Sequence, residues 1–133
     1  MTKTILLVED DPELQEIYLA MLENQDCRIL QAADGREALE QIRDVQPDLI
    51  LLDIILDEMM GDELFMKLKT DPLTASTPVV LATVLPEERC HQLLEVDPAT
   101  MFLRKPFRRS QLLEAVRLGF AQSAVKQAGQ SGD

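Results

Sequence analysis

The chain has 133 residues, with 13 Lys and Arg against 24 Asp and Glu, two Cys and no Trp. This is the length of one ordinary domain, which can bury enough apolar surface to fold without a disulfide or a structural metal. The net charge of −11 argues against sequence-independent binding to nucleic acid or to an anionic membrane, because both need a positive protein surface. Such an excess of acids also keeps a protein soluble.

The two halves of the chain differ in charge. Residues 1–63 carry 17 acidic and 4 basic side chains, whereas residues 64–133 carry 7 and 9. No apolar run approaches the roughly 20 residues of a membrane span, and the run near the N-terminus is too short for the core of a signal peptide. Cys27 and Cys90 lack the spacing of a disulfide pair or a redox motif. We therefore expect a cytoplasmic protein without membrane insertion and without direct nucleic-acid contact.

The first half of the chain alternates short apolar runs with amphipathic stretches. Pro12 stands where the first turn of a helix tolerates it, and Pro47 marks the end of a second helix. The predicted elements are a strand at residues 4–8, a helix with its apolar face from Leu14 to Leu22, a strand at 28–31, a helix with its apolar face from Ala38 to Val45, and a strand at 48–52.

The second half continues the alternation. Its predicted elements are a helix with its apolar face from Leu64 to Leu68, a strand at residues 79–82, a shorter helix around Cys90, Leu93 and Leu94, a strand at 101–103, and a helix with its apolar face from Leu112 to Phe120. Ser110 is predicted to cap the last helix. Because the sequence from Gln122 onward has little apolar content, we expect a domain of residues 1–121 and a flexible tail of residues 122–133.

This order predicts an α/β fold, in which a parallel sheet is covered by helices on both faces and the crossovers are right-handed. Three of the five predicted strands are almost continuously apolar, as strands buried on both faces should be. Ligands of open sheets of this class bind at the carboxyl ends of the strands. The residues just past each strand are therefore the first candidates for a functional site.

Charged and polar residues follow four of the predicted strands. Glu9 and Asp10 follow the first strand, Asp53 the third, Thr83 the fourth and Lys105 the fifth. Three carboxylates at one edge raise the cost of ionising one another, and a hard divalent cation such as Mg²⁺ removes that conflict. Thr83 and Lys105 could then contact a phosphoryl group, by a hydrogen bond and by a positive charge.

Each of these residues also has a purely structural explanation. The acidic run from Glu9 could be the first turn of a helix, where the helix dipole favours negative charge. Asp53 could simply end a strand, Thr83 could be a strand former, and Lys105 could be a solvated surface lysine. The joint arrival of all of them at one sheet edge favours a site.

Four motifs together resemble the receiver domain of two-component response regulators. They are Val8-Glu9-Asp10-Asp11, the run from Pro47 to Asp53 with Gly61 eight residues later, the run from Pro78 to Thr83, and the run from Phe102 to Phe107. The resemblance covers residues 3 to about 121. It implies a (βα)5 doubly wound sheet with strand order 2-1-3-4-5, a flavodoxin-like three-layer sandwich, and a signalling domain rather than an enzyme.

The resemblance also implies a phosphorylation site. Asp53 would accept a phosphoryl group from a sensor histidine kinase or a histidine phosphotransfer protein. Asp10, Asp53 and the backbone carbonyl of Ile55 would bind Mg²⁺ directly, and Glu9 would act largely through water. Lys105 would pair with Asp53 and then with the phosphoryl oxygens.

By the same resemblance, phosphorylation would act as a switch. Its added negative charge would draw Thr83 inward, and Phe102 would follow into the space vacated. The surface of the fourth helix, the fifth strand and the fifth helix would then change for a downstream protein target. The resemblance further predicts a cis Lys105-Pro106 bond.

The chain departs from the receiver pattern at several positions. Asp57 replaces a usual Pro, and Val84 replaces a usually small residue next to Thr83. Ile55 and Leu85 occupy the two positions that tune hydrolysis in the family, and neither side chain can position an attacking water. We therefore expect slow self-dephosphorylation. Asp57 and its acidic neighbours are expected to form a solvated loop and helix start rather than a second metal site.

Several alternatives stay open at this point. The chain could be a stand-alone response regulator, the receiver of a larger multi-domain regulator, or a pseudo-receiver that binds partners constitutively. An aspartyl-phosphate phosphatase is disfavoured, because such enzymes carry a second Asp where this chain has Ile55. A monomer and a phosphorylation-dependent homodimer both fit, with Arg104, Arg108 and Arg109 as a small basic cluster on a partner surface.

Overall fold

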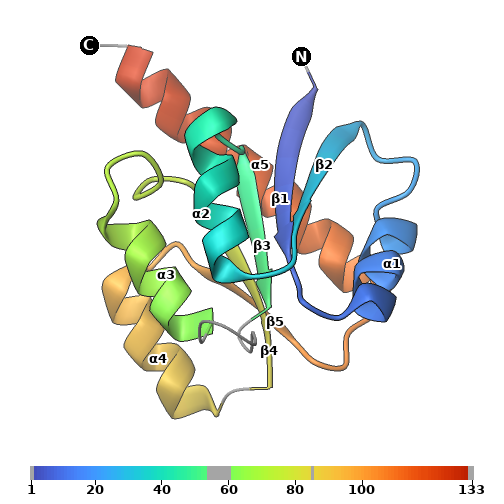
Figure 1. Ribbon diagram of the computed structural model, residues 1–133. Coiled ribbons are helices and arrows are strands. Elements are labelled where there is room, and N and C mark those ends of the chain that lie inside the picture. Colours follow the sequence, from blue (N-terminus) through green and yellow to red (C-terminus); the bar gives the residue numbers. More distant parts are fainter. Residues whose placement is uncertain (1, 54–60, 85, 132–133) are drawn as a thin grey trace.

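The computed structural model describes residues 2–53, 61–84 and 86–131, with side chains described for 2–53, 63–84 and 86–123. Strands and helices alternate through this part of the chain (Figure 1). The elements are β1 (Lys3–Val8), α1 (Pro12–Met21), β2 (Cys27–Ala32), α2 (Gly35–Asp44), β3 (Leu49–Asp53), α3 (Gly61–Thr70), β4 (Val79–Thr83), α4 (Glu87–Val96), β5 (Met101–Arg104) and α5 (Arg109–Ser131).

The strands form one parallel sheet in the order β2-β1-β3-β4-β5. This confirms the expected α/β fold and strand order. All five strands run in one direction, so their carboxyl ends meet at one edge, toward the bottom of Figure 1. Candidate site residues that lie far apart in the sequence are brought to this edge.

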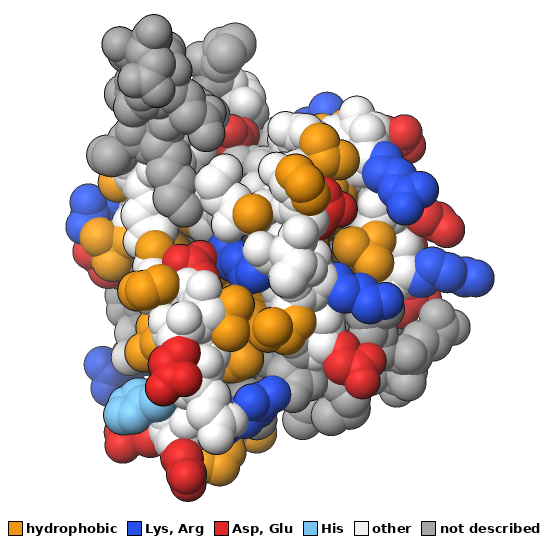
Figure 2. Space-filling model, turned by 90° about the vertical axis from the view of Figure 1, so that its left-hand side faces the viewer, with side chains coloured by type: hydrophobic (Ala, Val, Ile, Leu, Met, Phe, Trp, Pro, Cys, Tyr) orange, Lys and Arg blue, Asp and Glu red, His pale blue; other side chains and the backbone are white. Residues whose placement is uncertain are grey.

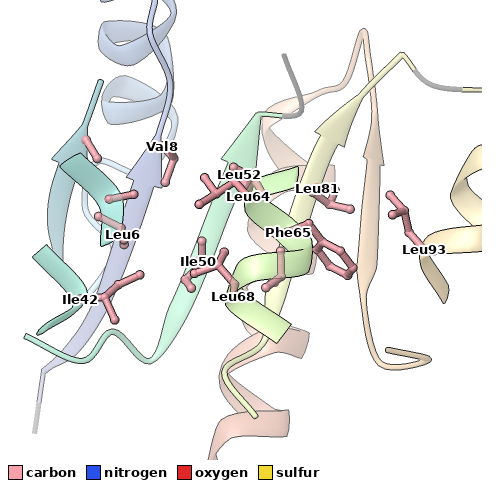
Figure 3. Close-up of a cluster of buried hydrophobic side chains, with 13 residues drawn as sticks. Leu6, Val8, Ile42, Ile50, Leu52, Leu64, Phe65, Leu68, Leu81 and Leu93 are labelled. Carbon is pink, nitrogen blue, oxygen red and sulfur yellow. The ribbon is translucent and has the colours of Figure 1, made fainter. Parts of the chain in front are cut away.

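Each face of the sheet carries its own apolar cluster. Helices α2, α3 and α4 cover one face, where Leu52, Leu64, Phe65 and Leu81 lie in a fully buried group (Figure 3). Helices α1 and α5 cover the other face, which contributes a second cluster. The members of that second cluster are Ile5, Leu7, Tyr18, Leu22, Leu49, Leu51, Val80, Ala82, Leu103, Leu112, Ala115 and Val116. Because both faces are covered, β3 and β4 are buried at every position, as their apolar runs predict.

The first two helices begin at aspartate caps. The Asp11 carboxylate accepts a hydrogen bond from the backbone N–H of Glu13 at 2.9 Å, and Pro12 opens the helix as predicted. The Asp34 carboxylate accepts from the N–H of Glu37 at 2.8 Å. Asp11 therefore has a structural role as a helix cap. Glu9 and Asp10 stay candidates for the functional site, and Asp11 does not.

The prediction that Ser110 caps the last helix is wrong. The first helical bonds are accepted by the carbonyl of Arg108, from Gln111 at 3.0 Å and Leu112 at 3.2 Å. The Gln111 side chain in turn accepts from the N–H of Arg108 at 2.7 Å, which is half of a capping box. Arg108 is therefore the cap position, and Ser110 lies inside the first turn.

Helix α5 also continues further than the apolar pattern indicates, to Ser131. Beyond Gln122 the sequence contains Ala, Gln and Lys, which are strong helix formers and extend a helix without an apolar face. The flexibility of residues 122–133 stays a prediction. Among the described residues, no helix is long and apolar enough to cross a membrane.

Candidate functional site

The side-chain alternation of the strands places Glu9, Asp53 and Lys105 on the same side of the sheet edge. Leu7, Leu51 and Leu103 belong to the cluster under α1 and α5. Each candidate lies two residues after one of these leucines, and successive strand residues alternate between faces. Three residues from three strand ends therefore point to one region.

Lys105 and Asp53 are in direct contact. The Lys105 Nζ donates a hydrogen bond to Asp53 Oδ2 and forms an ion pair with it. The Asp53 side chain is only 4 % exposed, whereas that of Lys105 is 29 % exposed. The Lys105 backbone N–H donates to the Thr83 carbonyl at 3.0 Å, and the Lys105-Pro106 bond is cis, as expected. A buried carboxylate thus meets an ammonium that reaches it from the solvent side.

Glu9 is the most deeply buried acid of the site, with 1 % exposure. Its Oε1 accepts from the backbone N–H of Asp11 at 3.1 Å, but its Oε2 has no hydrogen-bond partner among the described residues. Burial raises the pKa of the Glu9 carboxyl to about 9, and the neighbouring Asp53 carboxyl is the next cause. The hydrogen bond from Asp11 acts in the opposite direction. The site therefore crowds carboxyl groups together, and the raised pKa of Glu9 keeps its carboxyl protonated near neutral pH.

The residues present fit a hard divalent cation. The unpartnered Glu9 Oε2 lies beside Asp53, and Asp10, which is only partly buried, also raises the pKa of Glu9. Carboxylate oxygens are the donors that Mg²⁺ prefers. Among the described residues, no three carboxylate, His or Cys side chains are already grouped as ligands around one point. Because Asp53 already pairs with Lys105, a cation bound by Asp53 would share that carboxylate with the lysine.

Thr83 and Phe102 lie on the opposite side of the same sheet edge. Thr83 is fully buried at the end of β4. Phe102 on β5 is the register partner of Leu81 on β4. Its side chain is partly buried and packs against the cluster under α2, α3 and α4. Since Thr83 follows Leu81 by two residues, Thr83 and Phe102 belong to one face on adjacent strands.

Comparison with known proteins agrees with this geometry. The family model for the response regulator receiver domain matches residues 5–117. The chain belongs to the response regulator receiver family.

Two curated relatives and one solved structure illustrate the similarity. The chain is 37 % identical over 116 residues to the phosphate regulon transcriptional regulatory protein PhoB of Pseudomonas aeruginosa, covering 86 % of this chain and 50 % of PhoB. It is 31 % identical over 112 residues to the hybrid signal transduction histidine kinase D of Dictyostelium discoideum, covering 84 % of this chain and 7 % of that kinase. The crystallised chemotaxis protein CheY4 of Vibrio cholerae has a TM-score of 0.80 at 25 % identity, covering 90 % of this chain and 99 % of CheY4. The receiver thus spans about half the length of PhoB.

Some predicted positions of this receiver lie outside the described residues. They are Ile55, Asp57 and Leu85. Their predicted roles, a carbonyl ligand for Mg²⁺, a solvated loop and an apolar block to hydrolysis, stay predictions.

The basic cluster expected around Lys105 is divided in the structure. Arg104 and Arg108 are exposed, whereas Arg109 donates from Nε to the Met21 carbonyl at 2.8 Å and from Nη2 to the Glu23 carbonyl at 3.2 Å. Arg109 therefore faces the end of α1 and does not belong to the surface of α4, β5 and α5. The sequence gives no signal for this, because the two contacting segments are separated by 86 to 88 residues.

The sequence motifs also left Tyr18 and Phe107 without a role near the site. Tyr18 falls within the predicted helix whose apolar face runs from Leu14 to Leu22, and Phe107 is the last residue of a receiver motif. In the structure the two rings stack, with centroids 5.8 Å apart and planes inclined by 26°. The sequence signal for this contact is that an aromatic residue, Phe107, lies two positions after Lys105.

Proposed function

We propose that this receiver is phosphorylated on Asp53 by a phosphohistidine donor, in a reaction that depends on Mg²⁺. The observation that carries the proposal is the ion pair between Lys105 and the buried Asp53, next to the unpartnered Oε2 of Glu9. One carboxylate is thereby oriented and given a cationic partner, while a neighbouring acid stays available to a cation. The donor would be a sensor histidine kinase or a histidine phosphotransfer protein.

The transfer itself needs positioning and charge stabilisation more than covalent chemistry from the receiver. An Asp53 oxygen attacks the phosphorus, the O–P bond forms, and the N–P bond to the donor histidine breaks. The electron pair of that bond stays on the histidine nitrogen, which takes up a proton. Lys105 is placed to move from the Asp53 carboxylate to the oxygens of the phosphoryl group, where negative charge is concentrated.

Glu9, Asp10 and Asp53 would hold the magnesium ion, with the backbone carbonyl of Ile55 as a further ligand. When bound, Mg²⁺ supplies positive charge that offsets the repulsion between phosphoryl oxygens and carboxylates. The high pKa of Glu9 means that this carboxyl holds a proton near neutral pH when no cation is bound. A proton and a cation therefore compete for the Glu9 carboxyl group.

The output would be a change in the surface formed by α4, β5 and α5. The added charge at Asp53 favours a hydroxyl donor such as Thr83, and Phe102 shares its face of the sheet. Phe102 also lines a groove of about 570 Å³ between β5 and α5, together with Arg104, Gln111 and Leu118. Figure 2 shows the side of the molecule on the left of Figure 1, where apolar side chains lie among acidic and basic ones. A downstream protein would meet this mixed surface.

The length of the relatives bears on how the receiver is used. In PhoB the matched segment is half of a transcriptional regulator, and in the hybrid kinase it is a small part. These relatives support the alternative in which the receiver works within a larger regulator. A stand-alone response regulator requires the same phosphorylation chemistry, so the proposed reaction holds for both.

Intact mass spectrometry after incubation with acetyl phosphate and Mg²⁺ tests the proposal. Wild type should gain the mass of one phosphoryl group, and the Asp53→Asn variant should gain none. Modification that persists in Asp53→Asn would overturn the assignment of Asp53. If wild type stays unmodified, the chain is instead a pseudo-receiver that binds its partners without phosphorylation.

A further inference from the structure

An aromatic stack joins the segment that carries Lys105 to helix α1. The rings of Tyr18 on α1 and Phe107, two residues after Lys105, lie 5.8 Å apart between centroids at an inclination of 26°. This geometry is within the range of favourable aromatic pairs. We propose that Tyr18 and Phe107 are positioning residues that hold the Lys105 ammonium against Asp53.

The stack is anchored in the core of the protein. Tyr18 is only 3 % exposed and belongs to the cluster under α1 and α5, and Phe107 packs partly buried against the same cluster. Burial raises the pKa of the Tyr18 hydroxyl, and the charges of Asp53 and Glu9 raise it further. The Tyr18 ring therefore lies within electrostatic reach of the site as well as in contact with Phe107.

Arg109 ties the same segment to α1 at a second point. Its guanidinium donates to the carbonyls of Met21 and Glu23, at and just beyond the end of α1. The last turn of α1 contains no basic residue, so Arg109 supplies the positive charge that favours a helix C-terminus. Residues 105–109 are thus tied to β4 through the Lys105 amide, and to α1 through Phe107 and Arg109.

Lys105 needs this support because its own side chain is flexible. An ammonium on a four-carbon stem has many conformations, and this one is 29 % exposed to solvent. Its contact with Asp53 depends on where the backbone of residues 105–107 is held. A looser backbone would let the ammonium turn toward water, with Asp53 still in place at the end of β3.

Loss of the stack should slow phosphorylation without weakening the binding of a divalent cation. The ammonium of Lys105 and a divalent cation compete for the negative charge of Asp53, so a displaced ammonium favours cation binding. The same displacement removes a cation from the phosphoryl oxygens and slows phosphorylation. General damage to the fold would instead weaken both.

The main experiment compares Phe107→Leu with Phe120→Leu. Both phenylalanines pack partly buried against the same cluster, but Phe120 lies on α5, away from Lys105. We expect Phe107→Leu to lower the rate of phosphorylation by acetyl phosphate about fivefold or more, and to leave the calorimetric Mg²⁺ affinity unchanged or tighter. Phe120→Leu should stay within about twofold of wild type in both properties. Equal slowing in the two variants, or weaker Mg²⁺ binding in Phe107→Leu, would overturn the proposal.

Two further pairs sharpen the test. Tyr18→Phe keeps the ring and should retain the wild-type rate, whereas Tyr18→Leu should be slowed like Phe107→Leu. Arg109→Gln should also slow the reaction, and Arg117→Gln, which removes an exposed arginine paired with Glu114 on the same helix, should not. A wild-type rate in Tyr18→Leu would contradict the role of the stack.

The kinetic arm rests on the proposed function, so a second readout is independent of phosphorylation. Lys105→Met should lower the melting temperature in metal-free buffer, because it leaves Asp53 buried without its cation. We expect this loss to shrink by about half or more in the Phe107→Leu background, since the pair is already weakened there. An undiminished loss would refute the positioning role. A failure of wild type to be phosphorylated would refute only the proposed function.

Discussion

The ammonium of Lys105 contacts the carboxylate of Asp53 from the end of a different strand, although 52 residues separate them in the sequence. Strand β4 lies between the two strands that carry them. The contact therefore depends on the parallel order of the whole sheet edge and reports whether that edge is correctly assembled. The Oε2 of the neighbouring Glu9 has no hydrogen-bond partner among the described residues.

Replacement of Glu9 by Gln should stabilise the metal-free protein at alkaline pH. The Glu9 pKa is raised from 4.5 to about 9, so the native state holds a proton that the unfolded state has lost. Stability contributed by this group is fully present below about pH 4.5 and is lost as the pH rises toward about 9. In EDTA at about pH 8, we expect Glu9→Gln to gain about 1 kcal/mol or more, read as a rise of a few degrees in melting temperature.

The exposed residue Glu16 on α1 provides the control for this prediction. Glu16→Gln should leave the pH dependence of unfolding as in wild type. Added Mg²⁺ should stabilise wild type but have a reduced effect on Glu9→Gln. A Glu9→Gln variant that is less stable than wild type across this pH range would show that the buried carboxylate is satisfied within the protein.

Lys69 should be far more important for stability than its neighbour Lys67. The Lys69 side chain is 3 % exposed, and its ammonium lies 2.7 Å from Asp97 Oδ2 and 2.8 Å from the Thr77 carbonyl. Lys69→Met would leave these acceptors without the charge, and we expect a loss of about 2–4 kcal/mol in the free energy of unfolding. Lys67 is exposed on the same turn of α3, and Lys67→Met should change stability by less than about 0.5 kcal/mol. Equal urea midpoints for the two variants would contradict this difference.

Gly119 should resist substitution despite its place inside a helix. A Cβ at this position would lie 2.4 Å from Leu49 Cδ1 and 3.2 Å from Met101 Cε. Helix propensity alone favours Gly119→Ala by about 1 kcal/mol, but Leu49 is fully buried and has little room to move. We expect a net loss of about 1 kcal/mol or more in urea unfolding, so the sign of the change decides between the two effects. A stabilised Gly119→Ala would mean that α5 packs less closely on the sheet.

The phosphorylated receiver should lose its phosphoryl group slowly. Ile55 and Leu85 replace positions that tune hydrolysis in the family, and an apolar side chain cannot orient a water for attack. The Ile55→Asn, Leu85→Glu double variant should therefore shorten the half-life measured by loss of the phosphoryl mass after the donor is removed. Ile55→Val, which stays apolar, serves as the control and should match wild type. A half-life that does not change in the double variant would end this interpretation.

The sheet and its carboxyl edge were predictable because each depends on a local pattern. The apolar runs that end in Asp53 and Thr83 mark buried strands, and alternation along a strand places side chains on defined faces. Sequence periodicity could not locate the cap of α5. The cap is at Arg108, not at Ser110, because the backbone enters the helix two residues earlier, and the apolar pattern does not show that entry point. Helix propensity, not an apolar face, carries α5 past Gln122.

The contacts that support the site were not predictable from the sequence. The stack of Tyr18 on Phe107 and the bonds from Arg109 to the end of α1 join segments far apart in the chain. Their residue types are ordinary for a core aromatic and a surface arginine. The burial of Glu9 was likewise not predictable. Glu9 and Asp10 are adjacent acidic residues, yet Glu9 is buried and Asp10 is only partly buried.

The most direct test of the central claim is to locate the phosphoryl group on the chain. Wild type would be incubated with acetyl phosphate and Mg²⁺, reduced with borohydride to convert an aspartyl phosphate to homoserine, digested, and mapped by tandem mass spectrometry. We predict that homoserine forms at position 53 alone, and that no homoserine forms when Mg²⁺ is replaced by EDTA. Reduction at Asp10 or at any other position, with position 53 unmodified, would contradict the account.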